Sequence, residues 1–384
     1  MTAITPAATG AWTTTDDLPT PGSWGGQHDG PVVLDDDTVL VAGGAGATGA
    51  PLARVALYDP GAGTWATTGN LLTARRLHSV TLLADGKVLV VGGTGAGSAQ
   101  FPPPGLVAAE VYDPAAGTWS TTGNLHTGRW GHSATLLPDG SVLVAGGNAV
   151  RSSQSLTALC TAERWDPESG DWIEVEPMSD ARGGHPAVLL PNGKVLVVGG
   201  SVPTGRTTDA ALAFCELFDP DEETWAPTGS MTVPRARHQA TLAGTTVLAT
   251  GGTAPGPGGD GTFDPFARAT AETYQQATGT WTATDTMPAG RELHRAVAVS
   301  AGTVLVVGGT DGVRDAAGFA SALLYDVGDG TWDEATGLDA GRWSYAAVKL
   351  TGQKVLVTGG VARTGQAGSG LAAGTEVFDA TGTP

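Results

Sequence analysis

A Gly-Gly pair that ends a run of valine and leucine recurs along this chain at a nearly constant spacing. The pairs begin at seven positions that lie 49 to 57 residues apart, namely Gly43, Gly92, Gly146, Gly199, Gly251, Gly308 and Gly359. The stretch before each pair combines an extended apolar run, a tight turn and a β-branched run, as in RWGHSATLLPDGSVLVAGG at 129–147. A repeat of this length is typical of β-propellers and not of the shorter helical solenoids.

Each repeat contains signals for four short strands. After the Gly-Gly pair come a loop rich in Gly, Ala and Pro and then a third strand with an aromatic residue, which is Tyr58, Tyr112, Trp165, Phe218, Tyr274, Tyr325 or Phe378. A turn and a tryptophan follow in six repeats, at Trp65, Trp119, Trp172, Trp225, Trp281 and Trp332. A four-stranded unit is too small to bury its own faces, so the units must pack in a ring. We therefore predict an all-β, seven-bladed propeller.

The two ends of the chain predict how the ring closes. The last repeat stops after Phe378 and a turn, without the tryptophan that should follow. The N-terminal segment Gly10-Ala11-Trp12 supplies that turn and tryptophan. The first strand should thus be the outermost strand of the last blade, and we expect residues 1–384 to form a single domain.

Strand direction predicts which face carries function. With the strands of a blade lettered a to d from the axis outward, the d-to-a and b-to-c connections share one face, and the a-to-b and c-to-d turns share the other. The long connections are of the b-to-c type, for example 94–109 and 253–271, and the latter contains Phe263, Phe266 and Arg268. Long loops on a rigid scaffold are common places for binding sites, so we place the functional face there.

A ring of histidines is expected where the innermost strands begin. Thirteen residues after each tryptophan, six repeats reach His78, His132, His185, His238, His294 and Tyr345. The first repeat is interpreted as three residues longer, ending on His28. A sevenfold ring spreads its members around the channel, whereas metal ligands must converge on one ion. We therefore favour a structural role for the ring over metal binding by some of its members.

Arginine and glutamate recur together. An arginine lies three residues before the ring position at Arg75, Arg129, Arg182, Arg235, Arg291 and Arg342, and a glutamate lies two residues before the aromatic residue of strand c at Glu110, Glu163, Glu216, Glu272 and Glu376. A buried arginine requires a carboxylate, so we predict five pairs within blades. The first repeat has Gly25 and Ala56 at these positions, whereas the sixth keeps Arg291 opposite Leu323. Arg291 should then be either solvated or held for an anionic ligand.

The two positions between the arginine and the ring residue differ most from repeat to repeat. They and their neighbours define our candidate small-molecule site at the channel mouth, with apolar walls, positive charge and two titratable groups. Its candidate binding residues are Arg291, Arg76, Arg237, Trp24, Gln27, Trp130, Trp343, Phe263, Phe266 and Arg268, and its candidate catalytic residues are Glu292 and Tyr345. The alternative is that these are ordinary rim residues that happen to vary.

Composition excludes several kinds of partner. The net charge is −18, and a chain this acidic repels nucleic acid and anionic membrane surfaces. No basic and apolar leader opens the sequence, so a cytoplasmic protein is expected, and we expect a monomer. The two cysteines, Cys160 and Cys215, are too few for a disulfide framework and show no C-x-x-C spacing.

The recurring set of R-x-x-H, Gly-Gly, Glu-x-aromatic-Asp and Trp resembles the Kelch family, in the form found in galactose-oxidase-like propellers. That resemblance implies no copper site here, because Tyr345 is followed by Ala346 instead of histidine and the expected C-terminal domain is missing. The iron-binding Glu-x3-Asp-x3-His pattern of nitrile-specifier Kelch proteins is also missing. We expect no metal and no cofactor.

Two functions follow from this reading. The first is a cofactor-free isomerase, lyase or cyclase acting on an anionic, partly unsaturated or aromatic metabolite, in which Glu292 and Tyr345 exchange protons and Arg291 and Arg76 hold the anion. The alternative is a protein-interaction scaffold that uses the same loop face, which is the commonest use of Kelch propellers.

Overall fold

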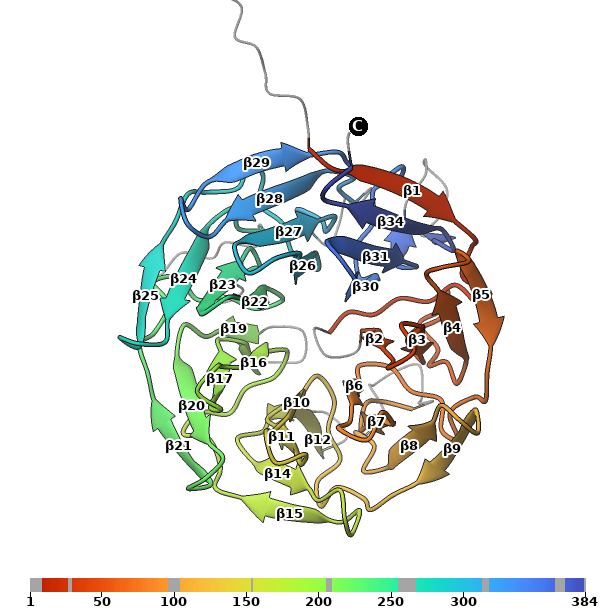
Figure 1. Ribbon diagram of the computed structural model, residues 1–384. Coiled ribbons are helices and arrows are strands. Elements are labelled where there is room, and N and C mark those ends of the chain that lie inside the picture. Colours follow the sequence, from red (N-terminus) through yellow and green to blue (C-terminus); the bar gives the residue numbers. More distant parts are fainter. Residues whose placement is uncertain are drawn as a thin grey trace, which may run out of the picture.

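The computed structural model describes residues 9–26, 30–95, 104–152, 155–204, 209–254, 267–312, 318–362 and 370–382. Within these ranges every regular element is a β-strand, and the strands form sheets arranged around a central axis (Figure 1). Seven sheets have four strands each, so the predicted seven-bladed propeller is confirmed.

The first four blades follow one another along the chain. Blade 1 consists of β2 (Val32–Val33), β3 (Val39–Ala42), β4 (Val55–Asp59) and β5 (Thr64–Thr67). Blade 2 consists of β6 (Ser79–Leu82), β7 (Val88–Val91), β8 (Ala109–Asp113) and β9 (Thr118–Thr121). Blade 3 consists of β10 (Ser133–Leu136), β11 (Val142–Ala145), β14 (Ala162–Trp165) and β15 (Trp172–Val175). Blade 4 consists of β16 (Ala187–Leu189), β17 (Val195–Val198), β20 (Cys215–Asp219) and β21 (Thr224–Pro227).

The last three blades complete the ring. Blade 5 consists of β22 (Gln239–Ala243), β23 (Thr246–Thr250), β24 (Ala271–Gln275) and β25 (Thr280–Ala283). Blade 6 consists of β26 (Arg295–Ala298), β27 (Thr303–Val307), β28 (Ala322–Asp326) and β29 (Trp332–Ala335). Blade 7 consists of β30 (Ala346–Leu350), β31 (Lys354–Thr358), β34 (Thr375–Asp379) and β1 (Ala11–Thr15).

The N-terminal strand closes the ring as the sequence predicted. Strand β1 pairs antiparallel with β34, with Trp12 opposite Phe378 and Ala11 opposite Asp379 (Figure 1). The Trp12 and Phe378 rings lie 5.0 Å apart, which matches the 5.0 Å between Tyr58 and Trp65 in blade 1. Both ends of the described chain are therefore held in one sheet.

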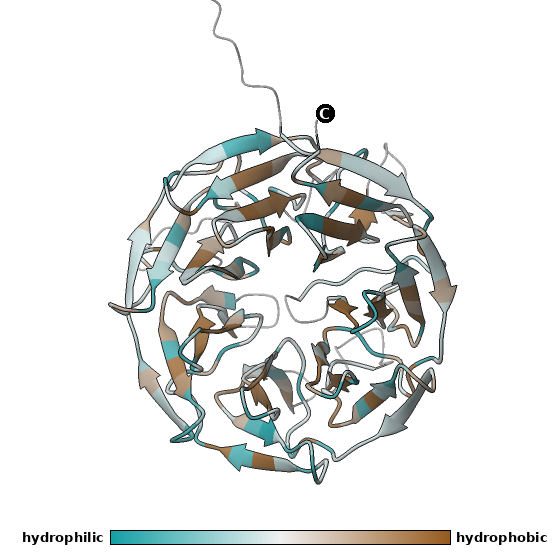
Figure 2. Cartoon of the chain, in the orientation of Figure 1, coloured by the Kyte–Doolittle hydropathy of each residue, from teal (hydrophilic) through white to brown (hydrophobic). Residues whose placement is uncertain are grey.

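The core lies between blades. Every residue of the second strands β7 and β11 is buried, because each blade is covered on both faces by its neighbours. The hydropathic colouring of Figure 2 shows apolar residues concentrated on the inner strands and polar ones on the outer strands. At the rim, tryptophans tie neighbouring blades together, as when Trp119 donates its indole N–H to the Gly69 carbonyl at 2.9 Å.

The b-to-c connections form short additional hairpins on one face. They pair β12 (Asn148–Ser152) with β13 (Ser155–Ala158), β18 (Ser201–Pro203) with β19 (Asp209–Ala211), and β32 (Val361–Ala362) with β33 (Gly370–Leu371). The residue after each blade's arginine bridges to the start of the b-to-c connection, as Glu292 does with Thr310 and Trp343 with Val361. The d-to-a and b-to-c connections therefore share a face, which we call the loop face. The opposite face, made of the a-to-b and c-to-d turns, is called the turn face.

Candidate functional site

The predicted arginine–glutamate pairs lie inside the blades, beneath the loop face. All five are present: Arg75–Glu110, Arg129–Glu163, Arg182–Glu216, Arg235–Glu272 and Arg342–Glu376, with N–O distances of 2.5 to 3.0 Å. Burial is the main cause that lowers the pKa of the Arg75 guanidinium, and the charge of Glu110 opposes that shift. These pairs are structural, because neither side chain is exposed.

Each glutamate also accepts backbone N–H groups from the d-to-a connection of its blade. Glu110 accepts the amides of Leu72 at 2.6 Å and Thr73 at 3.0 Å, which lie three and two residues before Arg75. Its carboxylate therefore accepts hydrogen bonds both from the buried Arg75 guanidinium and from the amides of the connection that leads into the blade.

Arg291 has neither a carboxylate partner nor contact with solvent. Its side chain is buried, and Nη1 donates to the carbonyls of Gly308 at 3.1 Å and Ser321 at 3.3 Å, while Nη2 donates to Ser321 Oγ at 3.2 Å. The Phe319 ring lies 5.1 Å from Cζ, and Leu323 is buried where other blades have glutamate. Burial lowers the pKa of Arg291 to about 10. The expectation of a solvated Arg291 is therefore wrong, and its bonding groups face the blade interior.

The histidine ring joins neighbouring blades. His132 Nε2 lies 3.0 Å from Ser79 Oγ of the preceding blade, and His294 Nε2 lies 2.8 Å from Thr250 Oγ1. Burial lowers the pKa of both His78 and His238 to about 3, so these rings are neutral near neutral pH. Among the residues that the structure describes, no group of three His, Cys, Asp or Glu side chains is placed to hold a metal ion.

Tyr345 occupies the ring position of blade 7 and behaves like the histidines. It is fully buried, its hydroxyl donates to the Val307 carbonyl of the preceding blade, and it accepts the Arg295 amide at 3.2 Å. Burial raises the pKa of its phenol. Tyr345 therefore lies within an interblade contact instead of on the channel surface.

The first blade departs from the expected alignment. Gly360 of blade 7 donates to Gly22 O at 2.8 Å, just as Gly44 of blade 1 donates to Arg75 O of blade 2 at 3.0 Å, so Gly22 and not Gly25 takes the arginine position. The Trp24 ring fills the slot of a ring histidine: a Cβ on Gly359 would meet it at 2.8 Å, just as a Cβ on Gly92 would meet the His132 ring at 2.8 Å. No three-residue insertion precedes this position, since Gly25 lies thirteen residues after Trp12.

This arrangement removes Trp24 from the surface of the channel mouth. Trp24 is only 2% exposed, and its indole N–H donates to the Ala42 carbonyl at 3.2 Å. It packs with Leu18 and Val41 between blades 7 and 1. We had expected Trp24 to form a wall of the site, but the structure places it in the core.

A partial ring of backbone hydrogen bonds surrounds the channel mouth. In blades 2 to 7 the residue just before the ring position has a positive φ, at Leu77, Gly131, Gly184, Arg237, Leu293 and Ser344. This conformation lets amides reach the preceding blade, as in Ser344 N to Leu293 O at 3.1 Å and Leu293 N to Arg237 O at 3.3 Å. Four of these six residues are not glycine, although L-residues rarely adopt such φ values.

Glu292 and Arg237 form an ion pair at this mouth. Arg237 Nη1 lies 3.2 Å from Glu292 Oε2, with the arginine side chain 46% exposed and the glutamate side chain fully buried. Asp209, on β19, lies close enough to Arg237 for its charge to lower the Asp209 pKa, although burial has the larger effect and raises it. Three consecutive blades thus contribute charged side chains to one place.

The other candidates lie around the same mouth. Arg76 is partly buried, with Nε 3.4 Å from Thr94 Oγ1, Trp130 is 7% exposed, and Trp343 is partly buried. Arg268 is partly buried beside Arg291, whose amide donates to its carbonyl at 3.1 Å. Gln27, His28, Phe263 and Phe266 lie outside the described residues.

Arg295 was not among the predicted site residues. Its guanidinium donates to three carbonyls of other blades, those of Tyr345 at 2.7 Å, Gly26 at 2.6 Å and Trp24 at 3.0 Å. The sequence does set this residue apart from its equivalents. The residue after the ring position is serine in blades 2 and 3, at Ser79 and Ser133, but arginine in blade 6. Arg295 fastens the first, sixth and seventh blades at the channel mouth.

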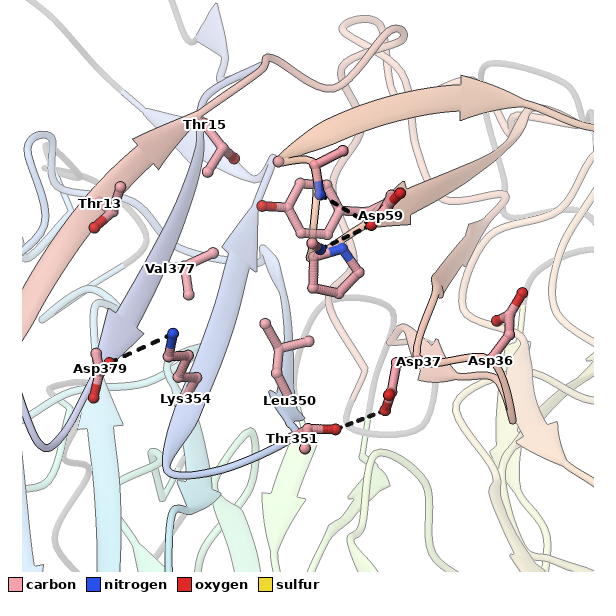
Figure 3. Close-up of a pocket in the computed structure, with 15 residues that line it drawn as sticks. Thr13, Thr15, Asp36, Asp37, Asp59, Leu350, Thr351, Lys354, Val377 and Asp379 are labelled. Carbon is pink, nitrogen blue, oxygen red and sulfur yellow. Dashed lines mark hydrogen bonds and ion pairs between the residues drawn. The ribbon is translucent and has the colours of Figure 1, made fainter.

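Two large cavities lined by described residues lie away from the predicted site. One of about 650 Å³ lies on the turn face between blades 7 and 1 (Figure 3). Two of its carboxylates have protein partners: Asp59 Oδ1 accepts the amide of Gly61 at 2.8 Å, and Asp37 Oδ1 in blade 1 accepts a hydrogen bond from the Thr351 hydroxyl of blade 7 at 2.6 Å. Another, of about 510 Å³, is the central channel among the innermost strands.

Comparison with known proteins identifies the family. A family model described as the KLHDC2/KLHL20/DRC7 Kelch-repeats domain matches residues 28–252, more than half of the chain. The chain belongs to the Kelch-repeat family. Among curated relatives, this Kelch propeller is 32% identical to human Kelch-like protein 33 over 115 residues, which are 30% of this chain and 20% of that protein. It is 26% identical to human Kelch-like protein 34 over 200 residues, which are 52% of this chain and 29% of that protein.

The likeness extends to plants and, in fold, to fungi. An F-box/kelch-repeat protein of Arabidopsis thaliana is 30% identical over 143 residues, 37% of this chain and 35% of that protein. The Kelch propeller thus covers between about a fifth and a third of the length of these relatives. A solved fungal alcohol oxidase of the AA5 family, in complex with copper, superposes with a TM-score of 0.71 at 17% identity, covering 96% of this chain and 76% of that one. The latter likeness concerns the fold alone.

Within the described ranges no helix is long and apolar enough to cross a membrane.

Cys160 and Cys215 are both free thiols, and burial raises the pKa of Cys215 to about 11.

Proposed function

We propose that this Kelch propeller binds a partner protein through its loop face, around the channel mouth. The observation that carries the proposal is the contrast between two groups of side chains there. Arg76, Arg237 and Trp343, from three different blades, are accessible at least in part. Arginine and tryptophan are the residue types most enriched in the energetic centres of protein interfaces. Glu292 and Tyr345, by contrast, are fully buried.

This contrast makes the enzyme interpretation the weaker one. An acid–base pair must reach the substrate, and its pKa values should lie near the working pH. The Tyr345 hydroxyl is engaged by Val307 and Arg295 inside the blade contact, and burial moves the pKa of this phenol away from neutrality. Arg291, the intended anion clamp, donates to blade carbonyls instead. The relatives that match are Kelch-like proteins, a family that we associate with protein interaction.

The rigidity of the mouth supports the same proposal. The backbone bonds between Leu293, Ser344 and Trp24, with the three bonds from Arg295, hold the loop-face rim of neighbouring blades in one arrangement. A pre-organised rim reduces the entropy lost when a partner binds. We propose a cytoplasmic setting for this interaction, as the sequence led us to expect.

Site-specific cross-linking tests the proposal. A photoreactive amino acid is placed at exposed loop-face residues Ala47 or Thr204, and at exposed turn-face residues Ala84 or Asn192 as matched controls. We expect one protein to be captured in source-cell extract from both loop-face positions and from neither turn-face position. Replacing Arg76 and Trp343 by alanine should reduce that capture while the thermal unfolding midpoint stays close to that of the wild type. Equal capture from both faces would contradict the proposal.

A further inference from the structure

The central channel is a cavity of about 510 Å³ among the innermost strands. Its walls come mainly from β16, β22, β26 and β30, in blades 4 to 7. Of the described residues that line it, two carry a charge, and both are basic: Arg295 and Lys349. The whole chain has 38 acidic and 20 basic residues, so this pair sets the channel apart from the rest of the protein. The volume lies within the range of small-molecule sites.

Lys349 breaks a pattern that the other blades keep. It pairs with Val355, four residues before the Gly-Gly pair of blade 7, and in blade 2 Leu82 pairs in the same register with Val88. The residues at this position in blades 2 to 6 are all apolar, namely Leu82, Leu136, Leu189, Leu242 and Ala298. The packing of a blade therefore does not require a charged residue here.

Lys349 is also the exception among the lysines. Of the four in the chain, three pair with an aspartate on the turn face at N–O distances of 2.7 to 3.6 Å, as Lys87–Asp85, Lys194–Asp219 and Lys354–Asp379. Lys349 is exposed and forms no ion pair with any residue in the described ranges. Because it is the last residue but one of β30 and lines the cavity, it offers a positive charge at the turn-face end of the channel.

The channel walls also offer backbone hydrogen-bonding groups. Each innermost strand pairs only with the second strand of its own blade, so its other edge faces the channel. One group on such an edge shows which kind of partner suits it: the Thr241 hydroxyl of blade 5 donates to the Ala296 carbonyl of blade 6 at 3.0 Å. A hydroxyl both donates and accepts, so hydroxyl groups suit an edge that carries N–H and C=O groups.

We propose that the channel binds a small polyhydroxylated carboxylate of the sugar-acid class. The carboxylate accepts hydrogen bonds from the Lys349 ammonium at the turn-face end, and the hydroxyls bond to the free edges of the innermost strands. Arg295, the first residue of β26, adds positive charge toward the loop-face end. This site goes beyond the proposed function, because it lies inside the channel and not on the loop-face rim that meets the partner protein.

Three six-carbon compounds separate the two parts of this recognition. Gluconate has a carboxylate and hydroxyls, sorbitol has hydroxyls alone, and hexanoate has a carboxylate alone. Isothermal titration calorimetry at low ionic strength measures the affinity of the protein for each compound. We expect gluconate to bind at least about tenfold more tightly than either of the others, because it alone meets both the ammonium group and the strand edges.

A pair of lysine variants locates the binding site. Lys349→Met removes the charge but keeps the length of the side chain, and it should weaken gluconate binding by at least about fivefold. Lys87→Met is the matched control, since Lys87 pairs with Asp85 away from the channel, and it should leave the affinity unchanged. Both variants should fold, because apolar residues occupy the position of Lys349 in five other blades and Lys87 is exposed at a turn, and urea unfolding checks this.

Three results would overturn the proposal. They are the lack of measurable gluconate binding, an affinity for gluconate no higher than for sorbitol or hexanoate, and an equal affinity in folded Lys349→Met. Capture of a partner by loop-face cross-linking is measured separately, so failure of the channel site and failure of the proposed function can be told apart.

Discussion

Pro288 and Leu323 depart together from the pattern that the other arginine-bearing blades share. In blade 2 the amide of Leu72, three residues before Arg75, donates to Glu110 at 2.6 Å. In blade 6 the corresponding residue is Pro288, which has no N–H, and the glutamate is replaced by Leu323. Blade 1 repeats this coincidence with Pro19 and Ala56. The glutamate is therefore present where a connection amide needs an acceptor, and it is missing where proline has removed that donor.

Rebuilding both partners in blade 6 should be cooperative. Leu323→Glu places a carboxylate beside Arg291, but only Pro288→Ser restores the N–H that this carboxylate would accept. We expect the double variant to be more stable than the sum of the single variants by about 1 kcal/mol, a coupling within the range for contacting residues. Urea unfolding of the four proteins in the cycle measures it. Strict additivity would show that the proline and the leucine vary independently.

Removing the glutamate of blade 2 should be costly. Glu110→Leu imitates blade 6 but leaves Arg75 and the amides of Leu72 and Thr73 without their acceptor. We expect a loss of about 3 to 5 kcal/mol in the free energy of unfolding, as for breaking one side of a buried ion pair. Glu168→Leu, at an exposed turn, is the matched control and should change stability by no more than about 0.5 kcal/mol. Similar losses of unfolding free energy in the two variants would show that Glu110 does not have this structural role.

The buried histidines should make the fold sensitive to acid. Burial lowers the pKa of His78 and His238 to about 3 from 6.5, so between these values the unfolded chain binds protons that the folded chain does not. The free energy of unfolding is therefore highest above about pH 6.5. It falls as the pH drops toward 3, by about 1.4 kcal/mol per pH unit for each histidine. Denaturant unfolding at a series of pH values measures this slope.

Blade 7 supplies the variant that checks the cause. His78→Tyr copies Tyr345, which occupies the same ring position and does not titrate in this range. The slope of the free energy of unfolding against pH should become shallower by about 1.4 kcal/mol per pH unit, which is the contribution of one histidine. An unchanged slope in a folded variant would place the acid sensitivity elsewhere.

Trp24 should be essential for closing the ring. Because its ring fills the histidine slot between Gly359 and Gly44, Trp24→Ala leaves a cavity at the seam of blades 7 and 1. We expect a loss of about 3 to 5 kcal/mol. Trp130→Ala, at a less buried position of blade 3, should cost less. Hydrogen exchange of β1 and β34 should rise selectively in the Trp24 variant. Unaltered protection of these strands would argue against a role in closure.

The repeat made most of the fold predictable. The spacing of Gly-Gly, aromatic and tryptophan residues predicted seven four-stranded blades, ring closure through Trp12 and five buried ion pairs, because each depends on local periodicity and on the need to pair a buried charge. The prediction is wrong in blade 1, where the thirteen-residue spacing leads from Trp12 to Gly25 and not to His28. The spacing is set by strand length and was the more reliable guide.

What the sequence alone determined is therefore the architecture and the pairing that holds it, since both follow from repeated chemistry at a fixed register. Only the tertiary structure decided which variable residues are accessible. Glu292 and Tyr345 looked like reactive groups and are buried, and Trp24 looked like a wall of the site and is core. Exposure at the mouth depends on how neighbouring blades and connections cover each side chain. That covering arises from contacts between segments about fifty residues apart, which a pattern within one repeat does not contain.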